Sequence, residues 1–174
     1  MEFFELGTIG MMGYLGYGVV ILIGIILLVS LFLTSGKKRI YVSVFLAGML
    51  VFMYVLLIYG PSKSGVVVNS DSLVVRISAF REFTVNREDI KDMFVVDLNE
   101  DDQYRPSLKT FGTAVGDYRT GNFRLKNGES ARFVANGNNV LVIELEDSYA
   151  ILAPKDFENF MGIMNNNFGL FFNN

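Results

Sequence analysis

The chain has 174 residues, 51% of them hydrophobic, and its 15 basic and 18 acidic side chains give a formal net charge of −3. It contains no cysteine and no histidine, which excludes disulfide bonds and thiolate chemistry and removes the commonest general base and transition-metal ligand. We therefore expect a protein that is not an enzyme and that carries no cofactor.

Two long stretches near the N-terminus carry no charge, from Leu6 to Gly36 and from Ile40 to Ser62. Each matches or exceeds the about 20 residues that a helix needs to cross a bilayer. The sequence predicts a transmembrane hairpin over residues 1–62, with spans at roughly 9–33 and 40–59. Gly24 and Gly48 lie at similar depth on either side of the turn and predict a close seam between the helices.

A short basic turn, Lys37, Lys38 and Arg39, joins the two spans. Short loops rich in lysine and arginine stay in the cytoplasm. We therefore expect a cytoplasmic turn, with the N-terminus and the following domain outside the cytoplasm. The acidic start and the length of the first apolar stretch are not those of a cleavable signal, so this helix is expected to stay in the mature protein.

The remainder of the chain, residues 63–168, has the composition of one soluble domain. It stays acidic when the basic turn and the two N-terminal glutamates are set aside, which argues against a nucleic-acid partner. Apolar and polar residues alternate in several short runs, as expected for antiparallel strands. The stretch from Asp97 to Lys109 has no such pattern. The alternating runs contain Leu73, Val75 and Ile77; Phe83 and Val85; and Leu141, Ile143 and Leu145. Met93 to Val96 is a mostly apolar run, and Tyr149 to Leu152 follows a turn.

A hairpin is expected around Asn127-Gly128, and its register can be derived from the side chains. A two-residue loop would set apolar against polar residues across the strands. A three-residue loop pairs Phe123 with Ala131 and Gly121 with Phe133 and separates the faces, so we prefer it, with Gly128 in the left-handed conformation.

The chain ends with a predicted helix that begins with Pro154 at its first position. Phe157, Phe160, Met161 and Met164 form one apolar stripe, which should lie on the sheet. We expect the apolar tail, residues 169–174, to tuck against the domain or to dip into the membrane surface.

Two stretches resemble the pleckstrin-homology-like (PH-like) domains of small bacterial and archaeal membrane proteins: Gly112 to Gly128 and Tyr149 to Phe160. The resemblance implies an α+β fold, in which the two-helix transmembrane hairpin precedes an antiparallel PH-like β-barrel or sandwich capped by a C-terminal helix. It also implies a binding or assembly role and no catalytic residues.

Four basic residues, Arg119, Arg124, Lys126 and Arg132, are expected near this hairpin. Together they could receive a phosphate or a lipid headgroup. The alternative is a charged face that is paired in place, with Arg132 opposite Glu144 on the next strand.

The segment Asp97 to Asp102 begins like a calcium loop. However, Asp102 and Leu108 stand where an EF-hand loop has its glycine and its bidentate glutamate, so we expect a solvated acidic loop and assign no metal site.

We interpret the chain as a membrane-anchored, non-enzymatic interaction module in the bilayer. Its expected partner is another membrane or surface protein, or a second copy of itself. The alternatives are a domain that binds lipid headgroups or anions, and an OB-type accessory regulator of a membrane protease. The terminal helix disfavours the last, because OB barrels of that kind finish in a strand.

Overall fold

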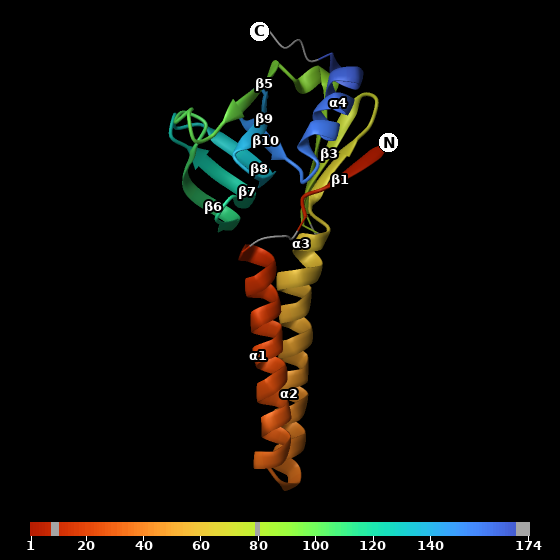
Figure 1. The fold of residues 1–174 in the computed structure, drawn as a ribbon, viewed down its shortest axis with the longest axis vertical. Coiled ribbons are helices and arrows are strands. Elements are labelled where there is room, and N and C mark those ends of the chain that lie inside the picture. The colour runs from red at the N-terminus through yellow and green to blue at the C-terminus, as the bar shows by residue number, and fades with distance from the viewer. Residues whose placement is uncertain (8–10, 79–80, 170–174) are drawn as a thin grey trace. The chain divides into compact units, whose positions relative to one another are not determined.

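The computed structural model describes all residues except 8–10, 79–80 and 170–174, and the side chains of residues 11 and 12 are also not described (Figure 1). The chain forms two compact units, Thr8–Pro61 and a unit made of Met1–Gly7 with Ser62–Asn174. Residues 1–7 were expected to belong to the hairpin, but they join the β unit because they supply a strand to its sheet. Residues 170–174 of the predicted apolar tail lie outside the described residues.

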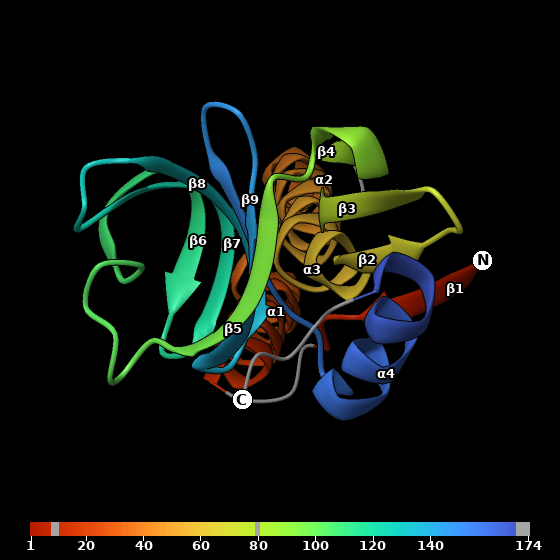
Figure 2. The same cartoon turned by 90° about the horizontal axis from the view of Figure 1, so that it is seen from above.

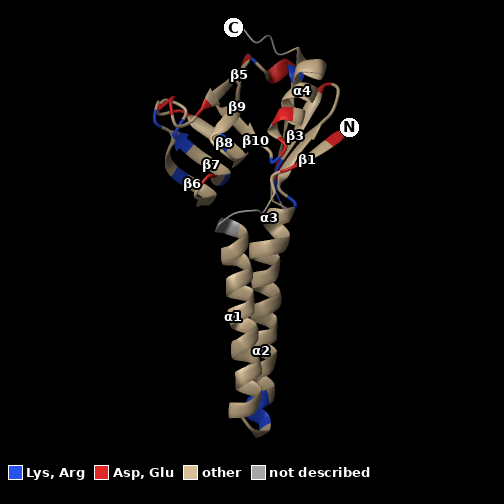
Figure 3. Cartoon of the chain, viewed as in Figure 1, with Lys and Arg blue, Asp and Glu red and all other residues tan. Residues whose placement is uncertain are grey.

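The hairpin consists of α1 (Met11–Leu33) and α2 (Gly36–Tyr54), followed by a π-helical turn (Val55–Tyr59) and the short helix α3 (Gly60–Ser62). The stretches Gly13–Leu33 and Gly36–Ser62 have mean hydropathies of 2.7 and 2.4 and are long enough to cross a bilayer. The two expected helices are therefore present, and both are compatible with membrane spans. The three basic residues of the turn lie in the first helical turn of α2 (Figure 3).

Small residues bring the two helices together, as expected, at one of the two predicted glycines. A Cβ added to Gly24 would lie 3.8 Å from Leu50 Cδ1, and one added to Gly16 would lie 3.1 Å from the carbonyl oxygen of Leu57. The prediction for Gly48 is wrong, because a Cβ there would meet nothing within 4 Å.

The first sheet of the β unit is antiparallel and has the order β1-β2-β3-β4. Its edge strand β1 precedes the hairpin in the chain, whereas its neighbour β2 follows it. Phe4 of β1 is 5% exposed and packs edge-on against Phe160, with 5.4 Å between the ring centroids. The strands are β1 (Glu2–Glu5), β2 (Gly65–Val68), β3 (Ser72–Ser78) and β4 (Arg81–Asn86).

The second sheet has the order β5-β9-β10-β8-β7-β6. Most of its pairs are antiparallel, but β10 lies between β8 and β9 and runs parallel to β8. The expectation of a purely antiparallel sheet is wrong at this pair, and over the described residues the two sheets do not close into a barrel. The strands are β5 (Asp92–Asp97), β6 (Pro106–Val115), β7 (Tyr118–Leu125), β8 (Ser130–Asn136), β9 (Asn139–Glu144) and β10 (Tyr149–Ala153).

Strand β6 begins within the stretch that shows no alternation in the sequence. Ser107 and Thr110 are extra residues in β6, because the pairing with β7 shifts at each of them. Their hydroxyls donate to β7 carbonyl oxygens, from Ser107 to Arg124 at 3.0 Å and from Thr110 to Asn122 at 2.9 Å. Two bulges so close together remove the two-residue period by which a strand is recognised.

The β7–β8 hairpin has the predicted register. Phe123 is paired with Ala131 and Gly121 with Phe133. Gly128 has φ of 91°, and its N–H donates to the carbonyl oxygen of Leu125 at 3.1 Å. The three-residue loop with a left-handed glycine is therefore confirmed.

The C-terminal helix α4 (Phe157–Phe168) lies on the β1 side of the domain (Figure 2). Its predicted stripe is confirmed, since Phe160, Met161 and Met164 are buried. The predicted helix start at Pro154 is wrong. The N–H of Lys155 instead donates to the carbonyl oxygen of Glu5 at 3.1 Å, and the helix begins only at Phe157.

Candidate functional site

One face of the β6–β7–β8 segment collects residues from three neighbouring strands. The register places Phe111 opposite Asn122 and Asn122 opposite Arg132, in one row across the sheet. Leu108, Arg124 and Ser130 form the adjacent row. Residues that face each other across a strand pair point to the same side. Both rows therefore lie on one face.

Strand β4 of the other sheet adds two residues to this face. Arg81 and Phe83 are two positions apart, so their side chains point to the same side of β4. The guanidinium carbon of Arg81 lies 4.6 Å from the centroid of the Phe111 ring, and that of Arg132 lies 4.6 Å from the centroid of Phe83. These two cation–π contacts are reciprocal and link the sheets. We call the set Arg81, Phe83, Leu108, Phe111, Arg124 and Arg132 the arginine face.

The three arginines of this face differ from the other five in their hydrogen bonds. Arg81, Arg124 and Arg132 have no hydrogen-bond acceptor and no acidic partner among the described residues, and all three are exposed. A guanidinium group offers five N–H donors in a fixed plane, so each leaves a full set of donors to the solvent. The others donate to protein oxygens: Arg39 to Thr34, Arg76 to Glu82, Arg87 to Asn167, Arg105 to Leu98, and Arg119 to Asn138.

Apolar groups lie beside these donors. Leu108 is 59% exposed and Phe111 is 53% exposed, although both belong to a strand of the folded domain. The face therefore presents cationic hydrogen-bond donors next to exposed apolar surface. This combination is more typical of a protein recognition site than of a surface that contacts only solvent.

An open groove of about 570 Å³ adjoins the face at Arg132. Its lining carries more acids than bases: Glu88, Asp89, Glu146 and Asp147 border it, against Lys91 and Arg132. Negative charge on this side repels an anion. An anionic ligand of the arginine face would therefore approach from the β6 side.

The structure separates the four basic residues that were expected to form one site. Arg124 and Arg132 share the arginine face. Arg119 points to the opposite side of β7, where it donates to Asn138 Oδ1 at 3.1 Å and lies 3.7 Å from Asp117 Oδ1. Burial lowers the pKa of its guanidinium, an effect that Asp117 counteracts. Arg119 therefore has a structural role, in which it joins the turn between β6 and β7 to the turn between β8 and β9.

Lys126 lies in a second basic cluster, in which it is neutralised. Its Nζ donates to Asp102 Oδ2 at 2.8 Å, and Asp102 Oδ1 lies 2.7 Å from Arg105. The hydrogen bond from Lys126 is the largest influence on Asp102 and holds the pKa of its carboxyl below the ordinary value. We call Asp102, Arg105 and Lys126 the loop cluster.

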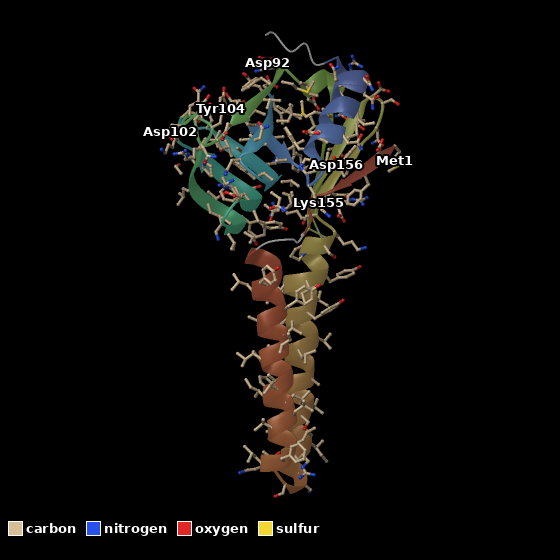
Figure 4. All side chains as sticks on the ribbon, viewed as in Figure 1. Met1, Asp92, Asp102, Tyr104, Lys155 and Asp156 are labelled. Atoms are coloured by element: carbon tan, nitrogen blue, oxygen red, sulfur yellow. The ribbon has the colours of Figure 1, made fainter. Side chains whose placement is uncertain are left out.

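The acidic loop itself folds back on the domain. Asp97 and Asp101 accept hydrogen bonds from the backbone N–H groups of Asn99 and Gln103, at 2.8 and 3.0 Å. Tyr104, beside Asp102 in Figure 4, packs edge-on between Phe94 and Tyr149. Among the described residues, no three acidic side chains come together in a way that could hold a metal ion.

Two details of the face differ from the expectation. Arg132 does not lie opposite Glu144, because β10 separates β8 from β9 and places Ala150 beside Arg132. Arg81 was not expected at all, since it comes from a strand of the other sheet. The only signal for it in the sequence is its spacing of two from Phe83.

Comparison with known proteins assigns the β unit. A family model described as Bacterial PH domain matches residues 65–167. No curated protein and no solved structure matches the chain. The matched segment runs from β2 into α4 and includes every strand of the arginine face, so the resemblance to PH-like domains is confirmed and the OB alternative is set aside. The chain belongs to the family of bacterial PH domains.

Proposed function

We propose that this protein is a membrane-anchored, non-enzymatic binding module that contacts another protein through the arginine face. The observation that carries the proposal is the set of three exposed arginines without acceptors, in a domain where the other arginines are paired. Two apolar helices suited to membrane spans supply the anchor.

We further propose that the N-terminus and the β domain lie outside the cytoplasm and the basic turn inside. The antiparallel pairing of β1 with β2 supports a common side for the N-terminus and the domain, since Glu5 lies opposite Gly65 at the two ends of the hairpin. Lys37, Lys38 and Arg39 favour a cytoplasmic turn.

This topology can be tested with single cysteines, since the chain has none of its own. An impermeant maleimide added to intact cells should label Ser130→Cys and leave Ser35→Cys unlabelled until the membrane is opened. Labelling of Ser35→Cys alone would reverse the orientation and place the domain in the cytoplasm.

The interaction itself can be tested by photo-crosslinking in intact membranes. A photoreactive phenylalanine analogue at Phe111 should form a discrete protein adduct that mass spectrometry can identify. The matched control is Phe3, which is 46% exposed and lies under Arg76 at 5.9 Å. Arg76 is paired with Glu82, so this position should give no adduct. Equal adducts at both positions would remove the arginine face from the proposal.

A second candidate function is binding of lipid headgroups or anions, and the same arginines favour it, because guanidinium groups bind phosphate in a bidentate way. Liposome flotation of the full-length protein is unsuitable, since the anchor itself inserts. The β unit should instead be released by two protease sites, placed after Gly7 and after Ser62 so that the unit keeps β1, and tested for recovery with anionic and with neutral liposomes. Equal recovery would count against lipid binding.

A further inference from the structure

Part of strand β6 is an exposed sheet edge that lacks the features which normally prevent pairing with another strand. β6 is the terminal strand of the six-stranded sheet and pairs only with β7 among the described residues (Figure 2). Exposed edges are normally blocked by charges, prolines or bulges, since their backbone groups can pair with any other strand. Residues 106–110 have such devices in Pro106, Lys109 and the two bulges.

The following segment, Phe111–Val115, has none of them, and its one position with a positive φ is Gly112, at 116°. It contains no charge and no proline, and its pairing with β7 runs without a shift from Phe111 to Val115. Its outer edge therefore offers backbone N–H and C=O groups to a further strand. Such strand addition is a common way in which a domain binds an extended peptide.

The charges beside this edge indicate which kind of strand can bind there. Arg81 lies over Phe111, the first residue of the open segment, and Arg124 lies opposite Leu108, just before it. Side chains of an added strand that point to this face would come next to Arg81. A second copy of this chain presents the same arginines beside this segment, so it brings no charge that is complementary to Arg81. An acidic strand has the complementary charge.

We propose that Phe111–Val115 binds an extended acidic segment of a partner protein as an additional strand, with carboxylates of that segment accepting hydrogen bonds from Arg81 and Arg124. This inference rests on the proposed function and names the chemistry of the partner. The cation–π contact of Arg81 with Phe111 holds the guanidinium near the edge without neutralising it, so its N–H donors stay available to an incoming carboxylate.

The experiment uses the full-length protein in nanodiscs of neutral lipid and a labelled peptide of alternating glutamate and valine. Binding is measured by fluorescence anisotropy. We expect the double variant Arg81→Gln/Arg124→Gln to bind at least about tenfold more weakly, which corresponds to about 1.4 kcal/mol. Arg76→Gln is the matched control, because Arg76 is an exposed arginine that is already paired with Glu82, and it should bind as the wild type does.

Two further peptides separate strand addition from simple charge attraction. The same sequence with alternate backbone nitrogens methylated keeps every carboxylate but cannot pair along an edge, and it should lose binding. A lysine and valine peptide should not bind. Equal binding of the methylated peptide, or no binding of the glutamate peptide, would overturn the proposal.

The lipid alternative is decided by combining the peptide measurement with the liposome test of the released β unit. If the released β unit binds anionic liposomes through Arg81 and Arg124 while the glutamate peptide fails to bind, the acidic-segment proposal is overturned in favour of a headgroup. A protein adduct at Phe111 without binding of the glutamate peptide would overturn this inference and leave the proposed function standing.

Discussion

The β domain has two basic regions that use the same residue types in opposite ways. In the loop cluster, Lys126 and Arg105 both bind Asp102, and the charges hold the loop in place. On the arginine face, Arg81 and Arg132 lie on aromatic rings and meet no acid among the described residues. The loop cluster is thus complete in the folded chain, whereas the arginine face has donors left for a partner.

The arginine face shows how a protein can hold an arginine without neutralising it. An acidic partner fixes a guanidinium but uses its donors. An aromatic ring fixes its plane through the flat face and leaves the N–H groups at the edge available. Such a side chain has lost part of its conformational freedom before binding, so less is lost when a ligand arrives.

The greatest loss of stability is expected when the close approach of β6 and β7 beneath the arginine face is disrupted. Gly112 and Gly121 face each other across β6 and β7 with φ of 116° and 119°, and a Cβ on Gly112 would collide with the carbonyl oxygen of Thr120. We expect Gly112→Val to destabilise the domain by about 3 kcal/mol or more, measured by urea unfolding in detergent micelles. Gly116→Ala is the control: it also has a positive φ but open space, so about 1 kcal/mol is expected.

A smaller effect is expected when only the ring beneath an arginine is removed. Phe83→Ala should cost about 1 to 2 kcal/mol, from lost burial and a lost cation–π contact, and should free the Arg132 side chain. The mobility of the Arg132 guanidinium can be followed by the NMR signal of its Nε–Hε group. The corresponding change Phe3→Ala should leave Arg76 ordered, because Glu82 still holds it. An Arg132 signal that does not change would contradict the role of the ring.

The two regions can also be made alike. Leu108→Glu places a carboxylate opposite Arg124 and should convert part of the arginine face into a paired cluster. Stability should change by less than about 0.5 kcal/mol, as for exposed charge pairs, while binding of the glutamate and valine peptide should fall about tenfold. Leu108→Gln removes the same apolar group without adding charge. Equal losses with both variants would show that Leu108, and not charge, controls binding.

The smallest effect is expected in the loop cluster. Asp102→Asn should lower the melting temperature slightly at neutral pH and leave peptide binding unchanged. Because Lys126 lowers the pKa of Asp102 in the folded protein, the contribution is complete above the ordinary carboxyl pKa of 3.8 and is lost as the pH falls through the lower folded value. Melting curves of wild type and variant should therefore converge in acid. A difference that persists there would assign the effect to packing.

The sequence was sufficient where the pattern is local. The β7–β8 register followed from keeping Phe123 and Phe133 on one face, and the α4 stripe followed from its period. It was not sufficient where distant segments meet. β1 has only four residues, and its partner β2 lies beyond the whole hairpin. The bulges at Ser107 and Thr110 hid β6.

The arginine face falls between these two cases. Arg124 and Arg132 could be placed together from the hairpin register alone. Whether an arginine is paired depends on which strand lies next to it, and the parallel insertion of β10 removed the expected Glu144 contact. The same dependence explains Arg81, which reaches Phe111 only because the two sheets meet there.

The pairing of β1 with β2 also sets an order of events during synthesis. β1 leaves the ribosome first, and its partner Gly65–Val68 follows only after both apolar helices have been made. The first sheet can therefore be completed only after both helices have been made, and only when the two ends of the hairpin lie on the same side of any bilayer between them. A nascent chain that inserts wrongly keeps the buried valines of β2 without their edge strand, and such unpaired strands are what chaperones and proteases recognise. Completion of the first sheet thus depends on segments that lie on both sides of the hairpin in the sequence.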